Sequence, residues 1–411
     1  MRKLSTISAS QAMTLGPQKP FWMAARGPFE LTRYVIGDTA RFAETTAGVY
    51  SADDGKQLFV SYDGPRRTLF DIESGQVRSL FQREDGSFRV GFGLSAIYPA
   101  RGRLKFTTGA DGRTDRLEWL REDGTSVSAK REDPKLEEVR FPSEGVTLAG
   151  TLATPPTPGP HPLIVNVHGS GRALHDWWTA QMTAFFLGEG FAVFSYHKRG
   201  TGQSGGEYVG ADSTTSSTSR QNLALLAKDA RAAVKAAAQN PRVDRRRVGL
   251  FGIGEAGFIM PSAAAGLPAI RYLVSFSAPV VPVSQANLHG LLFQDGEVDT
   301  GLDAEDVDAI VRRARREGYD PAPVLSRLRI PALFLYGSLD TRTPVPESER
   351  TLEKIERGHD FEVVSFPDAG HRLLSVPRDI KVESSRSSGF TAELLPVLRR
   401  WLGAHTGTKQ R

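Results

Sequence analysis

A glycine-dense corner at residues 252–257 has the sequence form of a nucleophile elbow. A short apolar run reaches this corner, and small residues with a helical pattern follow through residue 265. In a nucleophile elbow, a tight strand-to-helix turn of the form G-x-S-x-G lifts a serine hydroxyl above a parallel sheet, where it can attack an acyl carbon. The frame Gly252, Gly254, Ala256 puts glycine where that serine would stand. The corner therefore indicates serine-based acyl chemistry in a chain that lacks the serine.

The elements that would position this corner begin near residue 137. Apolar runs alternate there with helical patterns. The runs 162–167 and 191–196 are continuous, as expected of strands buried on both faces, and further runs cover residues 248–251, 272–276, 332–336 and 361–366. Together with a leading hairpin over residues 138–153, the alternation predicts a doubly wound α/β domain over residues 137–411. The segment 283–328 is longer than a normal connection and has its own helical pattern, so we expect a cap insertion there.

Residues 1–136 have a different pattern. Short apolar or aromatic runs are separated by turn dipeptides such as the Asp-Gly pairs at residues 63–64, 85–86 and 123–124. Strands that alternate with such turns are typical of antiparallel hairpins. No catalytic constellation lies in this segment, so we interpret it as a β-rich domain with a structural or lid-like role.

The charge balance argues against nucleic-acid binding. Lys+Arg number 52 and Asp+Glu 47 among 411 residues, and the basic residues are scattered. Solvated faces explain this pattern better than a nucleic-acid partner does. No apolar run has membrane-spanning length, and residues 4–13 do not form the apolar core of a signal peptide. We therefore expect a soluble, cytoplasmic protein without nucleic-acid or membrane partners.

The sequence predicts no cofactor and no metal. Cysteine is absent, which excludes disulfides, thiolate catalysis and cysteine-ligated metals, and the histidines are dispersed. Gly252, Gly254 and Gly257 have the G-x-G-x-x-G spacing of a dinucleotide-binding loop. That fingerprint normally lies in the first βαβ unit of a domain, whereas these glycines lie late in the expected domain.

Four further motifs accompany the glycine corner, and each follows an expected strand. They are His-Gly-Ser-Gly at 168–171, the glycine-rich loop 196–206, the loop 337–345 around Asp340, and Asp-Ala-Gly-His at 368–371, which ends in His371. Any one of these motifs would be weak evidence. The order of a nucleophile corner, then an aspartate, then a histidine makes the set specific.

With eight strand candidates and the corner after the fifth, residues 136–402 resemble the α/β-hydrolase fold. They most resemble the esterases and peptidase-like hydrolases related to dienelactone hydrolase and prolyl oligopeptidase. The resemblance implies a mostly parallel eight-stranded sheet with helices on both faces. The fold class expected for the chain is α/β, with the N-terminal β-rich domain and the helical cap insertion added to that sheet.

The resemblance gives three residues catalytic positions. Gly254 stands at the nucleophile position, and His371 corresponds to the general base. Asp340 corresponds to the carboxylate that accepts a hydrogen bond from this histidine, fixes its tautomer and stabilises its protonated form.

The resemblance also implies an oxyanion hole. In relatives, a loop corresponding to Gly169, Ser170 and Gly171 supplies one backbone N–H, and the residue after the nucleophile, here Glu255, supplies the second. The loop 196–206 departs from the family pattern because His197 replaces an aspartate. A structural role is the simpler interpretation of His197, and a place in the substrate pocket is the alternative.

Gly254 allows three interpretations. We favour a serine-type carboxylic ester hydrolase in which Gly254 is an inactivating substitution, so that the chain is an enzyme by family but inactive or strongly impaired. The alternatives are a natural non-hydrolytic relative that binds a ligand, and an enzyme in which His371 and Asp340 act as a general base without a covalent intermediate. The expected partner is a small-molecule ester or acyl substrate, with a peptide second, and the oligomeric state is open. Because glycine adopts strained elbow conformations with little penalty, we expect the fold to be intact.

Overall fold

The computed structural model describes residues 42 and 45–407, except 64–65, 95–98, 172–176, 210–217, 294–300 and 377–386, together with two short strands, β1 (Phe21–Trp22) and β2 (Arg33–Tyr34). The chain divides into two compact units. The first comprises Met1–Ile72 and Gln76–Glu132, and the second comprises Glu73–Gly75 and Asp133–Arg411. Each unit is described by itself below.

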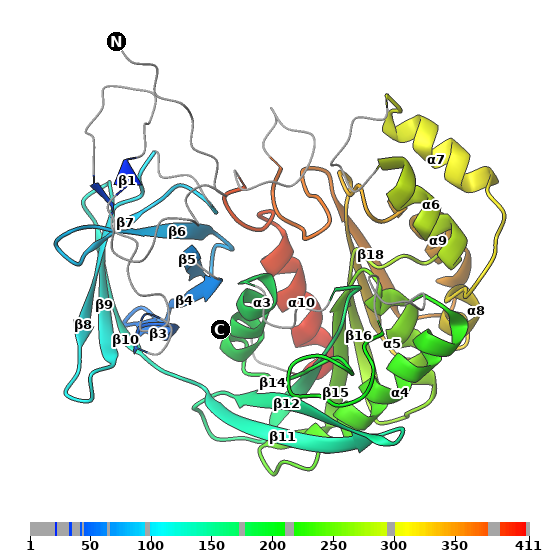
Figure 1. Cartoon of the computed structure of the whole chain (residues 1–411), viewed down its shortest axis with the longest axis horizontal. Coiled ribbons are helices and arrows are strands. Elements are labelled where there is room, and N and C mark those ends of the chain that lie inside the picture. The colour runs from blue at the N-terminus through cyan, green and yellow to red at the C-terminus, as the bar shows by residue number, and fades with distance from the viewer. Residues whose placement is uncertain are drawn as a thin grey trace. The chain divides into compact units, whose positions relative to one another are not determined.

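The first unit contains a closed barrel of eight antiparallel strands (Figure 1). The strands are β3 (Gly48–Ala52), β4 (Gln57–Asp63), β5 (Arg66–Asp71), β6 (Val77–Gln82), β7 (Phe88–Val90), β8 (Arg103–Thr108), β9 (Thr114–Leu120) and β10 (Ser126–Arg131). β10 pairs with both β9 and β3, which closes the barrel and leaves no free sheet edge. Tyr50, Leu104 and Trp119 belong to its buried core. The predicted antiparallel hairpins are confirmed, and their closure into a barrel is an addition to the prediction.

The second unit is built on an eight-stranded sheet with the order β11-β12-β14-β13-β15-β16-β17-β18. The strands are β11 (Lys135–Ser143), β12 (Val146–Thr154), β13 (His161–Val167), β14 (Ala192–Tyr196), β15 (Val243–Ile253), β16 (Ile270–Phe276), β17 (Ala332–Gly337) and β18 (Phe361–Phe366). β11, β12 and β14 pair antiparallel, and all later pairs from β14 to β18 are parallel. Every residue of β13 and β14 is buried, as the continuous apolar runs predict.

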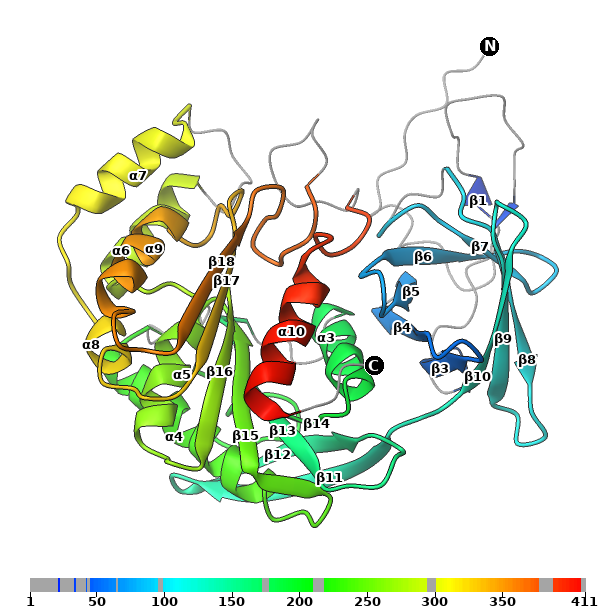
Figure 2. The ribbon, with the colours of Figure 1, turned by 180° about the vertical axis from the view of Figure 1, so that it is seen from behind.

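Helices cover both faces of this sheet, which Figures 1 and 2 show from opposite sides. α3 (Trp177–Gly188) and α10 (Leu394–Thr406) lie on one face, and α4 (Arg220–Ala237), α5 (Ala256–Ala265), α8 (Ala322–Leu325) and α9 (Val345–Ile355) lie on the other. The predicted cap segment contains α6 (Val283–Phe293), α7 (Ala304–Arg313) and α8. α6 packs against α7, and α7 packs against α9.

Helix α4 illustrates how the sequence sets these elements. The Ser219 side chain accepts a hydrogen bond from the N–H of Asn222 at 3.2 Å and thereby caps the first turn. Leu226, Ala230 and Ala233 recur at helical spacing and are buried on one face of α4. Small residues on this face let the helix lie close to the sheet.

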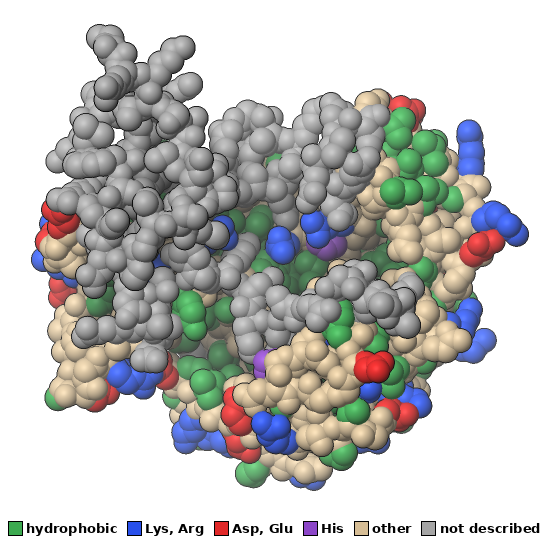
Figure 3. Space-filling model, viewed as in Figure 1, with side chains coloured by type: hydrophobic (Ala, Val, Ile, Leu, Met, Phe, Trp, Pro, Cys, Tyr) green, Lys and Arg blue, Asp and Glu red, His purple; other side chains and the backbone are tan. Residues whose placement is uncertain are grey.

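Charged side chains are interspersed on the face of the molecule seen in Figure 3, where basic and acidic groups alternate over the second unit without forming a single large patch. None of the helices in the described part of the chain combines the length and the apolarity needed to cross a bilayer.

Candidate active site

The glycine corner forms a tight turn between β15 and α5. Gly254 has φ +57°, in the left-handed region that glycine adopts readily and that L-residues with a side chain adopt at a cost. Its N–H donates to the carbonyl of Phe276 at 3.0 Å, and its carbonyl accepts from the N–H of Gly257 at 2.9 Å. A Cβ atom at Gly252 would lie 2.4 Å from the Cβ of Ala256, so the frame requires glycine and a small residue where strand and helix meet.

The backbone of the corner directs any side chain at position 254 toward a histidine. A Cβ atom at Gly254 would lie 3.3 Å from Nε2 and 3.5 Å from Cε1 of His371. A serine oxygen lies one bond beyond its Cβ, so it would come within hydrogen-bonding reach of the imidazole. The structure thus brings Gly254 and His371 together, although 117 positions separate them in the sequence, from 254 to 371.

His371 is held from its other side by Asp340. Nδ1 of His371 lies 3.1 Å from Oδ1 and 3.0 Å from Oδ2 of Asp340. The Asp340 side chain is fully buried, and its Oδ1 also accepts the backbone N–H groups of Arg342 at 2.7 Å and Thr343 at 3.0 Å. Three donor groups, one of which lies within reach of both oxygens, therefore fix the position of this carboxylate in the loop after β17.

The environment of Asp340 keeps it ionised. Burial by itself would raise the pKa of this carboxyl group. The positive charge of His371 and the hydrogen bonds from His371 and two backbone N–H groups act in the opposite direction, and the net pKa is below the ordinary value of 3.8. An ionised carboxylate only accepts hydrogen bonds, so Nδ1 of His371 carries the proton. Nε2, on the side of Gly254, is then the basic nitrogen of the ring.

The loop after β13 lies across the cavity from this pair. Gly169, Ser170 and Gly171 all line the cavity, as the oxyanion-hole prediction requires. Glu255 lines it too and directly precedes α5, so its N–H belongs to the first helical turn, where N–H groups have no partner within the helix. The predicted oxyanion-hole residues thus share one cavity with Gly254 and His371.

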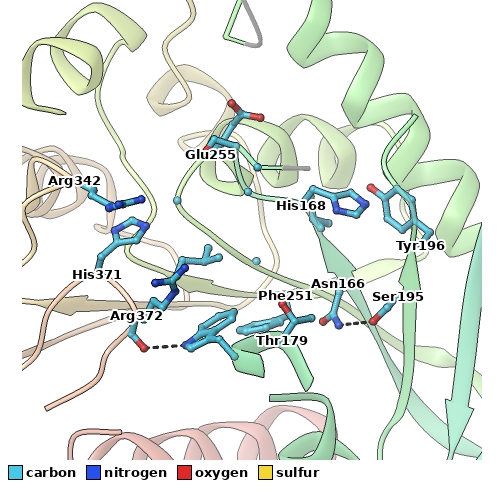
Figure 4. Close-up of a pocket in the computed structure, with 18 residues that line it drawn as sticks. Asn166, His168, Thr179, Ser195, Tyr196, Phe251, Glu255, Arg342, His371 and Arg372 are labelled. Atoms are coloured by element: carbon cyan, nitrogen blue, oxygen red, sulfur yellow. Dashed lines mark hydrogen bonds between the residues drawn. The ribbon is translucent and has the colours of Figure 1, made fainter. Parts of the chain in front are cut away.

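This cavity has a volume of about 250 Å³, and Figure 4 shows it with its lining side chains. Trp178 and Phe251 form an aromatic wall, with stacked rings whose centroids are 5.8 Å apart. Further lining residues are the polar pair Asn166 and Ser195 and the cationic pair Arg342 and Arg372.

Sequence reasoning missed these additional lining residues, although it had a signal for most of them. Arg342 lies two residues after Asp340 and Arg372 directly follows His371, so both belong to motifs already recognised. Asn166 and Ser195 are polar residues within otherwise apolar strands. The Nδ2 of Asn166 donates to Oγ of Ser195 at 2.6 Å across the β13–β14 pair.

His197 lies elsewhere. It is not among the residues that line the cavity, and its ring is packed against Gly202, where a Cβ atom would lie 2.1 Å from the imidazole Nδ1. Its N–H donates to the carbonyl of Ala149 at 2.7 Å, and burial holds the pKa of the ring below its ordinary value. A different histidine, His168 in the loop after β13, lines the cavity. Its ring meets that of Tyr196 edge-on, with centroids 4.5 Å apart.

The predicted cap segment contributes no described residue to the cavity lining. Residues 294–300 of that segment lie outside the described part of the chain. Among the residues that the structure describes, no group of three His, Asp or Glu side chains is arranged to hold a metal ion.

The strand order, with an elbow after the fifth strand and the Asp–His pair after the seventh and eighth, is that of an α/β hydrolase. The chain is a member of this superfamily, as the resemblance of its motifs indicated. Its residues 177–396 match the model of the prolyl oligopeptidase family, so more than half of the chain is matched and the protein belongs to that family.

Two curated relatives and one solved structure illustrate the similarity. The uncharacterized peptidase YuxL of Bacillus subtilis is 25% identical over 250 residues, which are 58% of this chain and 35% of that protein. Esterase EstD of Thermotoga maritima is 22% identical over 282 residues, 62% of this chain and 65% of its own length. The chain thus spans less than two thirds of either relative. The Pyrococcus furiosus esterase Pf2001 shares the fold, with a TM-score of 0.50, 18% identity and coverage of 67% of this chain and 92% of that one.

Proposed function

We propose that this chain carries the site of a serine-type carboxylic ester hydrolase from which the nucleophile is missing. One observation carries the proposal: a side chain at position 254 would point at Nε2 of His371 from 3.3 Å, while Nδ1 of the same ring is bonded to buried Asp340. Membership of a serine hydrolase family and similarity to an esterase support the same chemistry. Because Gly254 has no side chain, the hydroxyl that His371 would activate is missing.

The mechanism of the serine form follows from the geometry. The hydroxyl of Gly254→Ser would give its proton to Nε2 of His371 while its oxygen bonds to the acyl carbon. The oxyanion that forms would receive hydrogen bonds from the N–H of Glu255 and from a donor in the loop 169–171. Protonated His371 would then give its proton to the alcohol as the bond between the acyl carbon and that alcohol breaks. Water would next attack the acyl carbon and give a proton to Nε2 of His371, and the serine oxygen would leave with that proton, which releases the acid.

The chain with Gly254 retains substrate binding and oxyanion stabilisation but has no covalent route. Sites that lose a triad serine keep roughly 10³- to 10⁴-fold catalysis over water from these two contributions. We therefore expect residual or negligible ester hydrolysis. An ester is the favoured substrate, and a peptide is the alternative because the family also contains peptidases.

A second candidate function uses the same pair without a nucleophile. Because Nε2 of His371 faces the space that a side chain at Gly254 would fill, a water molecule bound there could lose its proton to this histidine and attack the acyl carbon directly. Asp340 would stabilise the protonated ring in either case.

Hydrolysis of a panel of p-nitrophenyl esters by the parent chain and by Gly254→Ser separates these functions. Circular dichroism and thermal unfolding establish that both proteins are folded. A serine form that is faster by several orders of magnitude supports the proposal, and loss of that gain in Gly254→Ser/His371→Ala attributes it to this site. Activity of the parent chain that also needs His371 supports the second candidate. Two folded but inert proteins would contradict both and leave a ligand-binding role.

A further inference from the structure

A fully buried lysine contacts the loop 169–171, called the oxyanion loop below because it carries one of the expected oxyanion donors. Lys198 follows β14 and is only 1% exposed. Its Nζ donates to the carbonyl oxygen of Gly169 at 3.0 Å and to Oε1 of Glu255 at 3.3 Å, and the Glu255 side chain is itself only 4% exposed. Removing two charges from water is costly, and replacing such a pair by apolar residues is often neutral or stabilising. The stability of the fold therefore does not by itself explain this pair.

The contact with Gly169 orients a peptide group of the oxyanion loop. In a trans peptide, the carbonyl of one residue and the N–H of the next point in opposite directions. Lys198 is not among the residues that line the cavity, whereas Gly169 and Ser170 are. Because the Gly169 carbonyl points at Lys198, the N–H of Ser170 points away from Lys198, and Ser170 itself lines the cavity.

The next peptide group is held in a similar way. The Tyr208 hydroxyl donates to the carbonyl of Ser170 at 3.3 Å, and Nζ of Lys198 lies 5.8 Å from the centre of the Tyr208 ring. Lys198 and Tyr208 thus form one support behind the loop. These two contacts hold the peptide groups on both sides of the Ser170 Cα atom, the first through the Gly169 carbonyl and the second through the Ser170 carbonyl.

The same ammonium group also binds the residue that carries the other expected oxyanion donor. Glu255 supplies its backbone N–H from the first turn at α5, and its carboxylate is the counter-charge of Lys198. We propose that Lys198 is a positioning residue that sets the separation and direction of the two oxyanion donors, the N–H groups of Ser170 and Glu255. The inference rests on the proposed function in that the oxygen bound there is an acyl oxygen.

The adjacent residue provides a contrast. Arg199 is also buried and donates to both oxygens of buried Asp229 in α4 at 2.8 and 2.6 Å, with Ser143 as a further donor at 2.6 Å. None of these three residues lines the cavity. The Arg199–Asp229 ion pair attaches the loop after β14 to α4. The ion pair of Lys198, by contrast, is formed with Glu255, which lines the cavity.

The test compares Lys198→Met with a matched lysine in the Gly254→Ser background. Lys228 pairs with Glu144 on the surface, with side chains 46% and 43% exposed, and neither residue lines the cavity, so Lys228→Met removes the same charge from an exposed ion pair outside the site. We expect Lys198→Met to lower kcat about a hundredfold to a thousandfold, the effect of losing one oxyanion donor, with KM changed less than about threefold. Lys228→Met should leave both constants unchanged.

A double variant distinguishes positioning from a structural role. Lys198→Met leaves the Glu255 carboxylate buried without its counter-charge, so part of its effect could be loss of stability. Lys198→Met/Glu255→Leu removes both charges, and we expect the thermal midpoint to recover while kcat stays low. Recovery of kcat together with the thermal midpoint, or an equal loss in the surface control, would overturn the proposal.

A binding measurement on the parent chain separates this proposal from the proposed function. Acetate serves as the probe, because its carboxylate presents an oxyanion to the two N–H groups. Acetate should shift the amide signals of Ser170 and Glu255 in NMR spectra of the parent chain, and Lys198→Met should weaken its binding at least about tenfold. If Gly254→Ser is inert but this result holds, the ester function fails and the positioning role survives. Equal acetate binding with and without Lys198, or no shift of either amide, overturns the positioning role.

Discussion

The two sides of the cavity differ in completeness. On one side, His371 is bonded through Nδ1 to both oxygens of a buried carboxylate, and two backbone N–H groups hold that carboxylate in place. On the other side, the elbow has a tight turn and close packing, and the loop 169–171 lines the same cavity, but position 254 has no side chain. The backbone of the elbow therefore does not depend on the nucleophile that an elbow normally carries.

The left-handed backbone at Gly254 explains this independence. A serine at φ +57° holds a conformation that costs about 1–3 kcal/mol, whereas glycine adopts it with little penalty. The serine would thus be favourable for chemistry and unfavourable for folding. The complete side of the site has no such conflict, because the hydrogen bonds of Asp340 serve both its position and its charge.

The largest expected effect is that of restoring the serine. Gly254→Ser should raise kcat for a p-nitrophenyl ester by about 10⁴- to 10⁶-fold, the range over which triad serines act. Steady-state kinetics with active-site titration by a fluorophosphonate would measure it. A folded serine form that neither reacts with the fluorophosphonate nor hydrolyses the ester would show that the two sides of the cavity are not a matched pair.

The Asp340–His371 pair can be disrupted without changing the elbow. In the Gly254→Ser background, Asp340→Asn should lower kcat by about 10⁴-fold, because an amide does not stabilise the protonated imidazole and can favour the wrong tautomer. The measurement is kcat at neutral pH, with KM as the internal control for binding. A loss of tenfold or less would mean that His371 does not need its carboxylate.

The elbow should respond in stability as well as in activity. Gly254→Ser should lower the free energy of unfolding by about 1–3 kcal/mol, the cost of the left-handed conformation for a residue with a side chain. Denaturant unfolding of the parent and the variant measures this difference. A serine form as stable as the parent would mean that a hydrogen bond to His371 offsets the strain.

The smallest expected effect is a change in pH dependence. The pKa of Asp340 in the folded chain is below its ordinary value, so its ionisation contributes stability that is fully present above the unfolded-state pKa near 3.8. That contribution is lost as the pH falls through the lower, folded-state pKa. Asp340→Asn should therefore have a flatter decline of unfolding free energy below pH 4 than the parent, as measured by urea unfolding at several pH values. If the unfolding free energies of the parent and the variant declined in parallel, Asp340 would not be a source of the pH dependence.

The sequence predicted those parts of the site that local backbone pattern determines. The glycine corner, the loop 168–171, Asp340 and His371 each lie in a short motif that follows a buried strand, and strand ends in a parallel sheet converge. Apolar runs likewise gave strands close to those observed, such as β18 at Phe361–Phe366.

The remainder depends on contacts between distant residues. Closure of the barrel requires Arg131 to pair with Tyr50, and no periodicity within either strand indicates that partner. In the sequence, Lys198 lies within a turn motif and nothing indicates its partners. Only the folded chain brings its ammonium group to Gly169 and Glu255. The sequence draws attention to His197 because it departs from the family pattern, whereas its neighbour Lys198 contacts Gly169 and Glu255.

The absence of a side chain at Gly254 also changes the time that a ligand spends in the cavity. In an enzyme with a serine, a bound ester leaves the complex either by dissociation or by transfer of its acyl group. With glycine at this position and the proposed site otherwise retained, dissociation becomes the main exit. If the proposed ester function holds, the same pocket would then bind an intact ester reversibly, and residence time would replace turnover as the quantity to measure.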